Sequence, residues 1–124
     1  MIAYVTLGTS DLARAAAFYD RLAAELGIGR FMETQQFIAW GTPDGAPGIG
    51  LTKPFDGGAP SVGNGTMVAL AARDRAQVDR LHAIALAAGG RDEGAPGERW
   101  PGFYAAYFRD PDGNKLNACV MEPT

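Results

Sequence analysis

The stretch TMVALAARDRAQVDRLHAIALAAGG, residues 66–90, decides the fold because it repeats an earlier stretch. It contains apolar residues, then a short polar segment with Asp74, and then apolar residues at helical spacing. The stretch AYVTLGTSDLARAAAFYDRLAAELGIG, residues 3–29, has the same order 63 positions earlier, so that Tyr4 corresponds to Met67. Each stretch therefore predicts a β-strand followed by an α-helix.

The first copy shows where its strand and helix begin and end. Apolar and other residues alternate from Ala3 to Gly8, as in a strand whose two faces have different surroundings. Ser10 or Asp11 is the expected N-cap of the helix, because either side chain accepts hydrogen bonds from the free N–H groups at a helix start. Gly27 is the expected end of this helix.

The repeat continues after the helices. FIAWGTPDG, residues 37–45, and AYFRDPDG, residues 106–113, each predict a strand that ends in a Pro-Asp-Gly turn, and another apolar strand follows each. A further strand is expected at residues 28–33 in the first half, whereas its counterpart around residues 95–101 has no clear pattern. Each half is therefore predicted to be βαβββ.

Two fused half-domains explain this repeat better than a solenoid does, because the repeat is long and occurs only twice. The predicted fold class is α+β. We expect a single domain over residues 1–124, with a first module at about 1–57 and a second module at about 64–124. The composition, 47% apolar and 20% charged, is typical of a folded domain with a core of its own.

Charge and hydropathy exclude several kinds of partner. The formal charge is −3 and the 11 Lys and Arg residues form no run, so the positive stripe of a nucleic-acid binder is missing. No apolar stretch of about 18 residues predicts a membrane span, and Asp11 and Arg14 interrupt any secretory apolar region. The single Cys119 closes no disulfide within the chain. We therefore expect a cytoplasmic protein without nucleic-acid or membrane partners.

The pattern resembles the vicinal-oxygen-chelate superfamily, the glyoxalase, bleomycin-resistance and dioxygenase family. The resemblance covers essentially the whole chain and is carried by MIAYVTLGTSDLARAAAFY at the start, ALAAGG at the end of the second helix and YFRDPDGNKL near the C-terminus. It implies two βαβββ modules that form a curled mixed sheet, a cup, with the helices outside and a small-molecule ligand inside. It also implies a homodimer whose interface lies next to the ligand site.

The resemblance assigns metal ligands to four positions, which are Tyr4, Gly50, Met67 and Asn117 in this chain. Metal-dependent members carry His, Glu or Gln there. Zn²⁺ and the octahedral metals depend on imidazole and carboxylate donors, whereas this set offers a phenol with a pKa near ~10, no side chain, a thioether and an amide. We therefore expect no metal and no other cofactor. An Fe²⁺ dioxygenase site needs two His, and the chain has one.

Aromatic and soft side chains gather in the segments expected to line the cup, where small-molecule pockets are mostly apolar with a few polar groups. The alternation of the first strand turns Tyr4 and Thr6 inward, and that of the last strand turns Asn117, Cys119 and Met121 together. Aromatics in strands are also typical of a core, so this alternative stays open. Phe55 and Tyr107 belong to the same aromatic-rich segments. The candidate ligand-binding residues are Tyr4, Thr6, Phe37, Trp40, Met67, Trp100, Phe103, Tyr104, Asn117, Cys119 and Met121.

Other reactive residues have simpler interpretations. His82 is expected to pack in the second helix, outside the cup. Cys119 has no neighbouring cation in the sequence that would lower the pKa of its thiol, so we expect an inert thiol. Asp110 and Asp112 are expected to bond the backbone of their own turn. No residue is assigned a catalytic role, and whether the chain is an enzyme stays open.

Three functions fit the sequence. The preferred one is a glyoxalase/bleomycin-resistance-like protein that binds a small, partly apolar molecule in the cup without metal. The second is a lactoylglutathione-lyase-like isomerase, although that chemistry needs a metal and a carboxylate base. The third is an antibiotic-sequestering resistance protein, which binds its drug unchanged.

Overall fold

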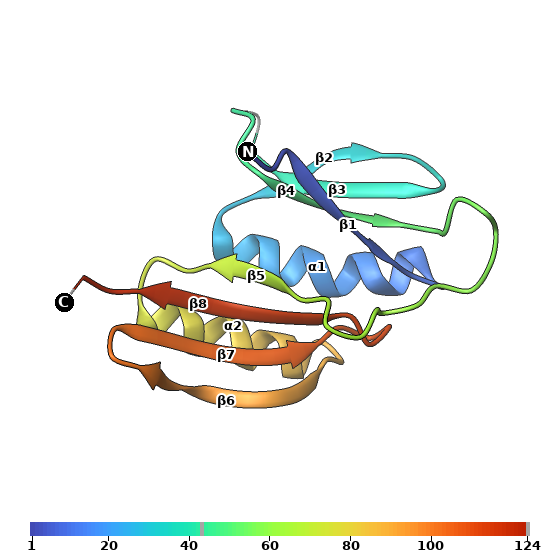
Figure 1. Ribbon diagram of the computed structural model, residues 1–124. Helices are drawn as coiled ribbons and strands as arrows, with labels where there is room; N and C mark the ends of the chain where they lie inside the picture. The colour runs from blue at the N-terminus through green and yellow to red at the C-terminus, as the bar shows by residue number, and fades with distance from the viewer. Residues whose placement is uncertain (43, 124) are drawn as a thin grey trace.

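The computed structural model describes residues 1–42 and 44–123 (Figure 1). Within these residues the chain forms two helices and eight strands. The first half contains β1 (Tyr4–Gly8), α1 (Leu12–Leu26), β2 (Gly29–Glu33), β3 (Phe37–Gly41) and β4 (Gly48–Thr52). The second half contains β5 (Val68–Ala71), α2 (Arg75–Ala87), β6 (Arg91–Trp100), β7 (Phe103–Arg109) and β8 (Lys115–Met121).

The strands form two four-stranded sheets of identical topology. Sheet A has the order β1-β4-β3-β2 and sheet B the order β5-β8-β7-β6. In each sheet the first and last strands of the half run parallel, and the other neighbours run antiparallel. The predicted α+β fold with two βαβββ modules is confirmed. The two sheets are not hydrogen-bonded into one: no Cα atom of β1 lies within 8 Å of one in β5, and both strands are described in full.

The helix boundaries follow from their caps. Asp11 accepts a hydrogen bond from the backbone N–H of Arg14, and Gly27 ends α1 with a φ of 73°, so both predictions for this helix are confirmed. Asp74 caps α2 in the same way through the N–H of Gln77. Neither helix in the described part of the chain is long and apolar enough to cross a membrane.

The second strand of each module lies at a sheet edge. β2 falls within the range expected for it, whereas β6 is longer than the unclear segment in the sequence and is interrupted by three register shifts against β7. Gly94, Pro96 and Gly97 lie in this irregular part. Proline donates no ladder hydrogen bond and glycine weakens a strand, so both are tolerated at such an edge and both hide the alternation.

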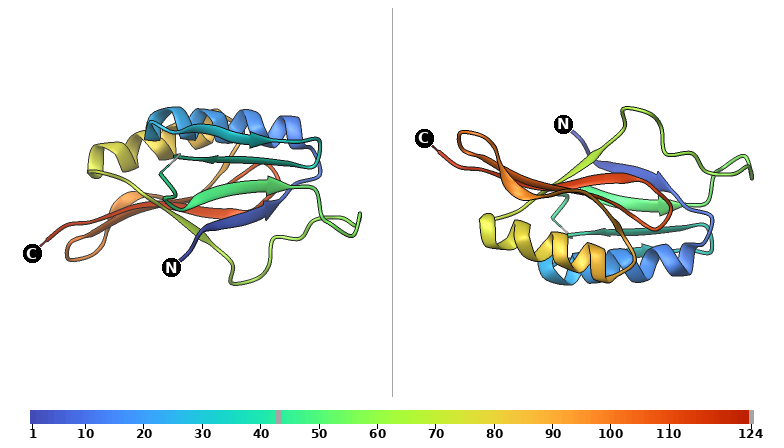
Figure 2. Two further views of the ribbon diagram at one scale, coloured as in Figure 1. Left: turned by 90° about the horizontal axis from the view of Figure 1, so that it is seen from above. Right: turned by 90° about the horizontal axis from the view of Figure 1, so that it is seen from below.

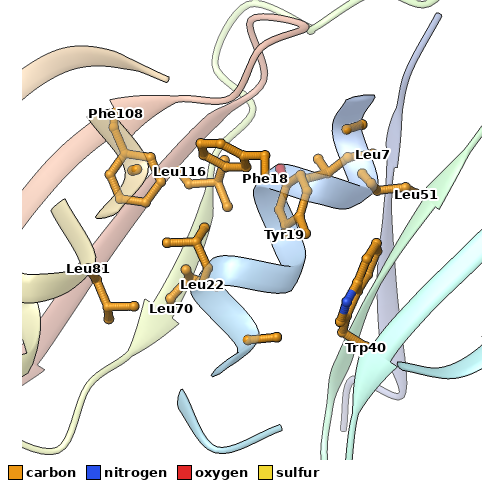
Figure 3. Packing of buried hydrophobic residues seen from close by; sticks show 14 of the residues in the cluster. Leu7, Phe18, Tyr19, Leu22, Trp40, Leu51, Leu70, Leu81, Phe108 and Leu116 are labelled. Carbon is orange, nitrogen blue, oxygen red and sulfur yellow. The ribbon is translucent and has the colours of Figure 1, made fainter. Parts of the chain in front are cut away.

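One core joins the two modules. α1 packs on β2, β3 and β4, α2 packs on β6, β7 and β8, and the helices pack on each other. In both views of Figure 2 they lie together along one side of the molecule. Phe18 and Leu22 of α1 meet Leu81 of α2 and Phe108 of β7 in the buried cluster, with the rings of Phe18 and Phe108 centred 6.4 Å apart (Figure 3).

The turn before β8 is bonded to the first module. The hydroxyl of Tyr19 donates to Asp110 Oδ2 over 2.7 Å, and that of Thr9 donates to Asp112 Oδ2 over 2.6 Å. Asn114 Nδ2 donates to the carbonyl of Gly8 over 2.9 Å. The two aspartates also bond within the turn or to the start of α1, so their role in the fold is to fix one module against the other.

Candidate functional site

Each sheet has one face turned away from the helices, which we call its open face. In β8, Leu116 and Ala118 are fully buried on the helix side, so Asn117, Cys119 and Met121 lie on the open face of sheet B. Register extends this row across the sheet. Asn117 is the partner of Tyr107 in β7 on one side and of Ala69 in β5 on the other.

Asn117 is the unusual residue of this row. Its side chain is 2% exposed, yet its Oδ1 atom has no hydrogen-bond partner among the described residues. A buried acceptor left unpaired costs about 1–3 kcal/mol, and native proteins contain few of them. This oxygen is hydrogen-bonding capacity that no described residue uses, although neighbouring side chains cover the atom.

An apolar platform lies at one end of the same face. The rings of Trp100 and Phe103 stack with centroids 4.3 Å apart and planes 13° from parallel, at the hairpin that joins β6 to β7. Trp100 is 55% exposed, and Met121, the register partner of Phe103, is also exposed. Flat, accessible aromatic area of this kind binds the apolar part of an organic molecule.

The thiol of Cys119 lies half-buried on this face. Burial raises the pKa of the thiol. A nucleophilic cysteine needs the opposite shift, from a cation or a helix N-terminus close to the sulfur. The geometry thus agrees with the expected inert thiol.

The open face of sheet A is partly filled by its own side chains. Tyr4 is 59% exposed, and its ring meets that of Phe37 edge to face with centroids 6.5 Å apart. The Phe37 ring also lies over Gly50, so closely that a Cβ atom at position 50 would collide with it. Thr6, the register partner of Gly50, is exposed beside them.

The four positions that the family uses for metal do not fit a metal here. Phe37 occupies the place where a side chain at position 50 would project. Tyr4 and Asn117 lie in different sheets, and the only oxygen donors of the set are a phenol and a neutral amide, which bind divalent metals weakly without carboxylates or imidazoles. In residues 1–42 and 44–123, no three His, Cys, Asp or Glu side chains gather where they could hold a metal ion.

Two of the candidate residues face the helices instead of the open faces. Trp40 is 2% exposed and packs against Tyr19 (Figure 3). Its Nε1 donates to Asp20 over 2.8 Å. Tyr104 donates its hydroxyl to Asp79 of α2 over 2.6 Å. Neighbouring residues of a strand point to opposite faces, so Trp40 and Tyr104 point away from the open faces. Both thus lie on the helix side of their strands, and Trp40 also lines the apolar space between the modules.

The remaining aromatic and histidine residues lie elsewhere. Phe55 is fully exposed in the segment after β4. His82 is 8% exposed in α2, and its Nε2 lies 2.9 Å from Asp92 Oδ1 on the helix side of sheet B. His82 is thus a packing residue at the back of the sheet, as the sequence predicts.

A cleft of about 670 Å³ separates the two sheets. Val5 and Ile49 of sheet A form one wall, Met67 and Leu70 form the other, and Leu22 of α1 lies in its floor. β1 and β5 border this cleft with their unpaired edges. Met67 thus contributes to an apolar space between the modules.

Two cations lie on the open face of sheet B, Arg99 and Lys115, and sequence reasoning missed Lys115. Both lie beside the ring of Tyr107. The signal was available for Lys115, which is two residues before Asn117 in the same strand and therefore shares its face. It was not available for Arg99, because the irregular β6 shows no alternation.

Comparisons with known proteins agree with this architecture. A family model described as Glyoxalase/Bleomycin resistance protein/Dioxygenase superfamily matches residues 1–118. A solved glyoxalase/bleomycin resistance protein from Albidiferax ferrireducens is 38% identical, with 96% of this chain and 97% of that chain covered and a TM-score of 0.89. No curated protein matches at a significant level.

Other solved structures are more distant. A lactoylglutathione lyase from Agrobacterium tumefaciens is 26% identical, with 96% of this chain and 92% of that chain covered and a TM-score of 0.69. A glyoxalase/bleomycin resistance protein/dioxygenase family enzyme from Burkholderia phytofirmans is 23% identical, with 96% and 97% covered and a TM-score of 0.78. The latter likeness shows the fold alone.

Two βαβββ modules that share a core define the class of paired βαβββ proteins. Within that class, the match over residues 1–118 shows that the chain belongs to the glyoxalase/bleomycin resistance protein/dioxygenase superfamily.

Proposed function

We propose that the chain is a metal-independent member of this superfamily that binds a small, partly apolar molecule on the open face of sheet B. The observation that carries the proposal is the buried, unpaired Oδ1 of Asn117. The ligand donates a hydrogen bond to this oxygen, and its apolar part lies on the stacked rings of Trp100 and Phe103. Met67 and Cys119 contribute to the surrounding surface.

Tryptophan fluorescence tests this proposal, because the two tryptophans have opposite surroundings. Trp100 is exposed beside the proposed site, and Trp40 is buried behind sheet A. We expect a ligand found in a panel of small metabolites to change the emission of the Trp40→Phe protein saturably, with and without EDTA. The Trp100→Phe protein keeps only the buried reporter and should show little change. Binding that requires added Ni²⁺ or Zn²⁺ would contradict the proposal.

A lactoylglutathione-lyase-like activity is the second candidate, favoured by the similarity to the lyase from Agrobacterium tumefaciens. That reaction needs a metal that polarises neighbouring oxygens and a base that moves a proton. The residues at the four family positions supply neither. Turnover of the hemithioacetal of methylglyoxal and glutathione, lost with a chelator and restored by Ni²⁺ or Zn²⁺, would favour this candidate over metal-free binding.

We also propose that the protein is a homodimer. β1 and β5 each have one unpaired edge, and Ile2, Tyr4 and Met67 are exposed near the apolar cleft between them. Unpaired edges and exposed apolar surface are usually covered in a stable protein. The mass of one chain is 13.0 kDa, and light scattering should give twice this value. Tyr4→Lys and Met67→Lys should lower that mass, whereas Phe55→Lys, at an exposed position outside the cleft, should not.

A further inference from the structure

Two cations share one aromatic ring on the open face of sheet B. The Cζ atom of Arg99 lies 5.3 Å and the Nζ atom of Lys115 lies 5.6 Å from the centre of the Tyr107 ring. Arg99 comes from β6 and Lys115 from β8, the strands on the two sides of β7. Tyr107 is the register partner of Asn117, so the ring that both cations contact belongs to the residue beside Asn117 in the sheet.

These two cations lack the partners that most other arginines have. Arg99 donates to the carbonyl of Ala95, and no ion pair joins Arg99 or Lys115 to an acid in residues 1–42 or 44–123. The acid that acts on Lys115 is Glu93, which is bonded to Arg109. The pKa of Glu93 is lowered mainly by Arg109 and to a smaller extent by Lys115. The cations that act on Glu93 are thus Arg109, Lys115 and Arg91, and Arg109 alone is bonded to it.

The other acids of β6 are turned to the opposite side. Asp92 pairs with His82 of α2, and Glu98 pairs with Arg75 of α2. The open face therefore keeps a positive excess in a protein whose net charge is −3. A local excess of this sign in an acidic protein attracts anions to that face and not to the rest of the surface.

Space for a ligand group adjoins the cations. A hollow of about 490 Å³ is lined by Lys115, Arg109, Met67 and residues 62–66. The hydroxyl of Tyr107, whose ring both cations contact, forms no hydrogen bond with any described residue and is a further donor of this residue cluster. Cationic and hydroxyl donors beside a hollow suit a carboxylate or a phosphate group.

We propose that the ligand of this face is an organic anion, whose carboxylate or phosphate group is bound by Lys115 and Arg99 and whose hydroxyl or amide N–H donates to Asn117 Oδ1. The proposal rests on the proposed function, since it names the ligand class of the same face. The anionic group lies at the Tyr107 end of the face, and the apolar part extends toward Trp100 and Phe103. A neutral apolar molecule would leave both charges without a partner.

Two probes that differ only in charge test the ligand class. Phenyllactate has a ring, a hydroxyl and a carboxylate, and phenyllactamide is its neutral amide. In ¹⁵N-labelled protein, we expect phenyllactate to shift the amide resonances of Tyr107, Lys115 and Asn117 and to bind roughly tenfold more tightly than the amide at low salt, because charge-assisted hydrogen bonds are the stronger ones. Added salt should reduce this difference.

Matched variants assign the effect to the two cations. Lys115→Met and Arg99→Met should each remove most of the preference for phenyllactate. Lys53→Met and Arg21→Met change the net charge equally at exposed positions outside sheet B and should leave the preference intact. Folding of all four variants is checked by circular dichroism.

The outcomes separate the two proposals. Equal binding of both probes, with affinity unchanged in Lys115→Met and Arg99→Met, overturns the anionic ligand and leaves a binding face for neutral molecules. Absence of shifts at Tyr107 and Asn117 with either probe at millimolar concentration overturns both proposals. A preference that falls equally in the Lys53→Met and Arg21→Met proteins would show an effect of net charge and would also overturn the assignment to this face.

Discussion

Replacing Asn117 by leucine should stabilise the protein and weaken ligand binding at the same time. The Oδ1 atom is buried without a partner, which costs about 1–3 kcal/mol in the folded state. Leucine has the same branched arrangement of side-chain heavy atoms and no polar atom, so Asn117→Leu should raise the free energy of unfolding by about 1–2 kcal/mol. For a domain of this size, the melting temperature should rise by about 4 °C for each kcal/mol.

The chain offers a control in Asn114, which is 4% exposed and whose Nδ2 makes two hydrogen bonds. Its Nδ2 donates to the carbonyl of Gly8 and to Asp110 Oδ2, each over 2.9 Å. Asn114→Leu removes the donor of the Gly8 carbonyl, while Tyr19 still donates to Asp110 Oδ2, so the free energy of unfolding should fall by about 1–3 kcal/mol. The two substitutions are chemically identical, so their opposite signs depend only on the hydrogen bonds that each amide makes in the folded protein.

Urea unfolding followed by circular dichroism measures both changes, and comparison of the m-values checks that the unfolded states are alike. A loss of stability in Asn117→Leu as large as that in Asn114→Leu would refute the reasoning, because it would mean that the Asn117 amide is satisfied within the folded chain. The phenyllactate titration then measures the effect on binding. The affinity for phenyllactate should fall in Asn117→Leu although the protein is more stable.

Three further predictions concern single groups. Burial, and next to it Asp110, raise the pKa of Tyr19 in the folded state above 10.0, the ordinary pKa of a tyrosine. The free energy of unfolding should therefore fall as the pH rises above 10.0. Tyr19→Phe should reduce this fall and lower the stability by about 1 kcal/mol at neutral pH, as measured by urea unfolding across the alkaline range. Trp40→Ala should cost about 3–5 kcal/mol and Trp100→Ala less than about 1 kcal/mol, as measured by thermal melts, because Trp40 is buried and Trp100 is exposed. Cys119 should react with a disulfide reagent at pH 8 at least about tenfold more slowly in the folded protein than in urea, since burial raises the pKa of its thiol; equal rates would contradict this.

The repeat in the sequence was enough to predict the topology, and strand alternation was enough for part of the site. Tyr4 and Asn117 were assigned to faces by alternation along β1 and β8, and each lies on an open face. Trp40 and Tyr104 were grouped with their neighbours as aromatic residues without regard to alternation. Applying the same period of two to β3 and β7 would have placed both against the helices.

The spacing between the sheets could not be predicted in this way. Alternation fixes which face of a strand is covered, but it contains no information on which sheet edges meet. Whether β1 and β5 pair depends on how α1 and α2 pack between the modules, and that packing rests on contacts such as Phe18 with Phe108, 90 residues apart in the chain. The place of Arg99 on the open face depends on the same tertiary information, because Arg99 reaches Tyr107 only through the irregular register of β6.

The two modules have the same topology but differ in what they offer a ligand. Gly50 and Asn117 occupy corresponding places in the last strand of each module. At Gly50 the Phe37 ring fills the space above the strand, so the first module covers its own site. At Asn117 the neighbouring positions hold alanines and Tyr107, and the amide oxygen stays unpaired. A duplicated fold needs both halves for its shared core, but it needs only one for binding. The hydrogen-bonding capacity and the positive charge are both found on the second half, which is why the proposed ligand site is assigned to sheet B alone.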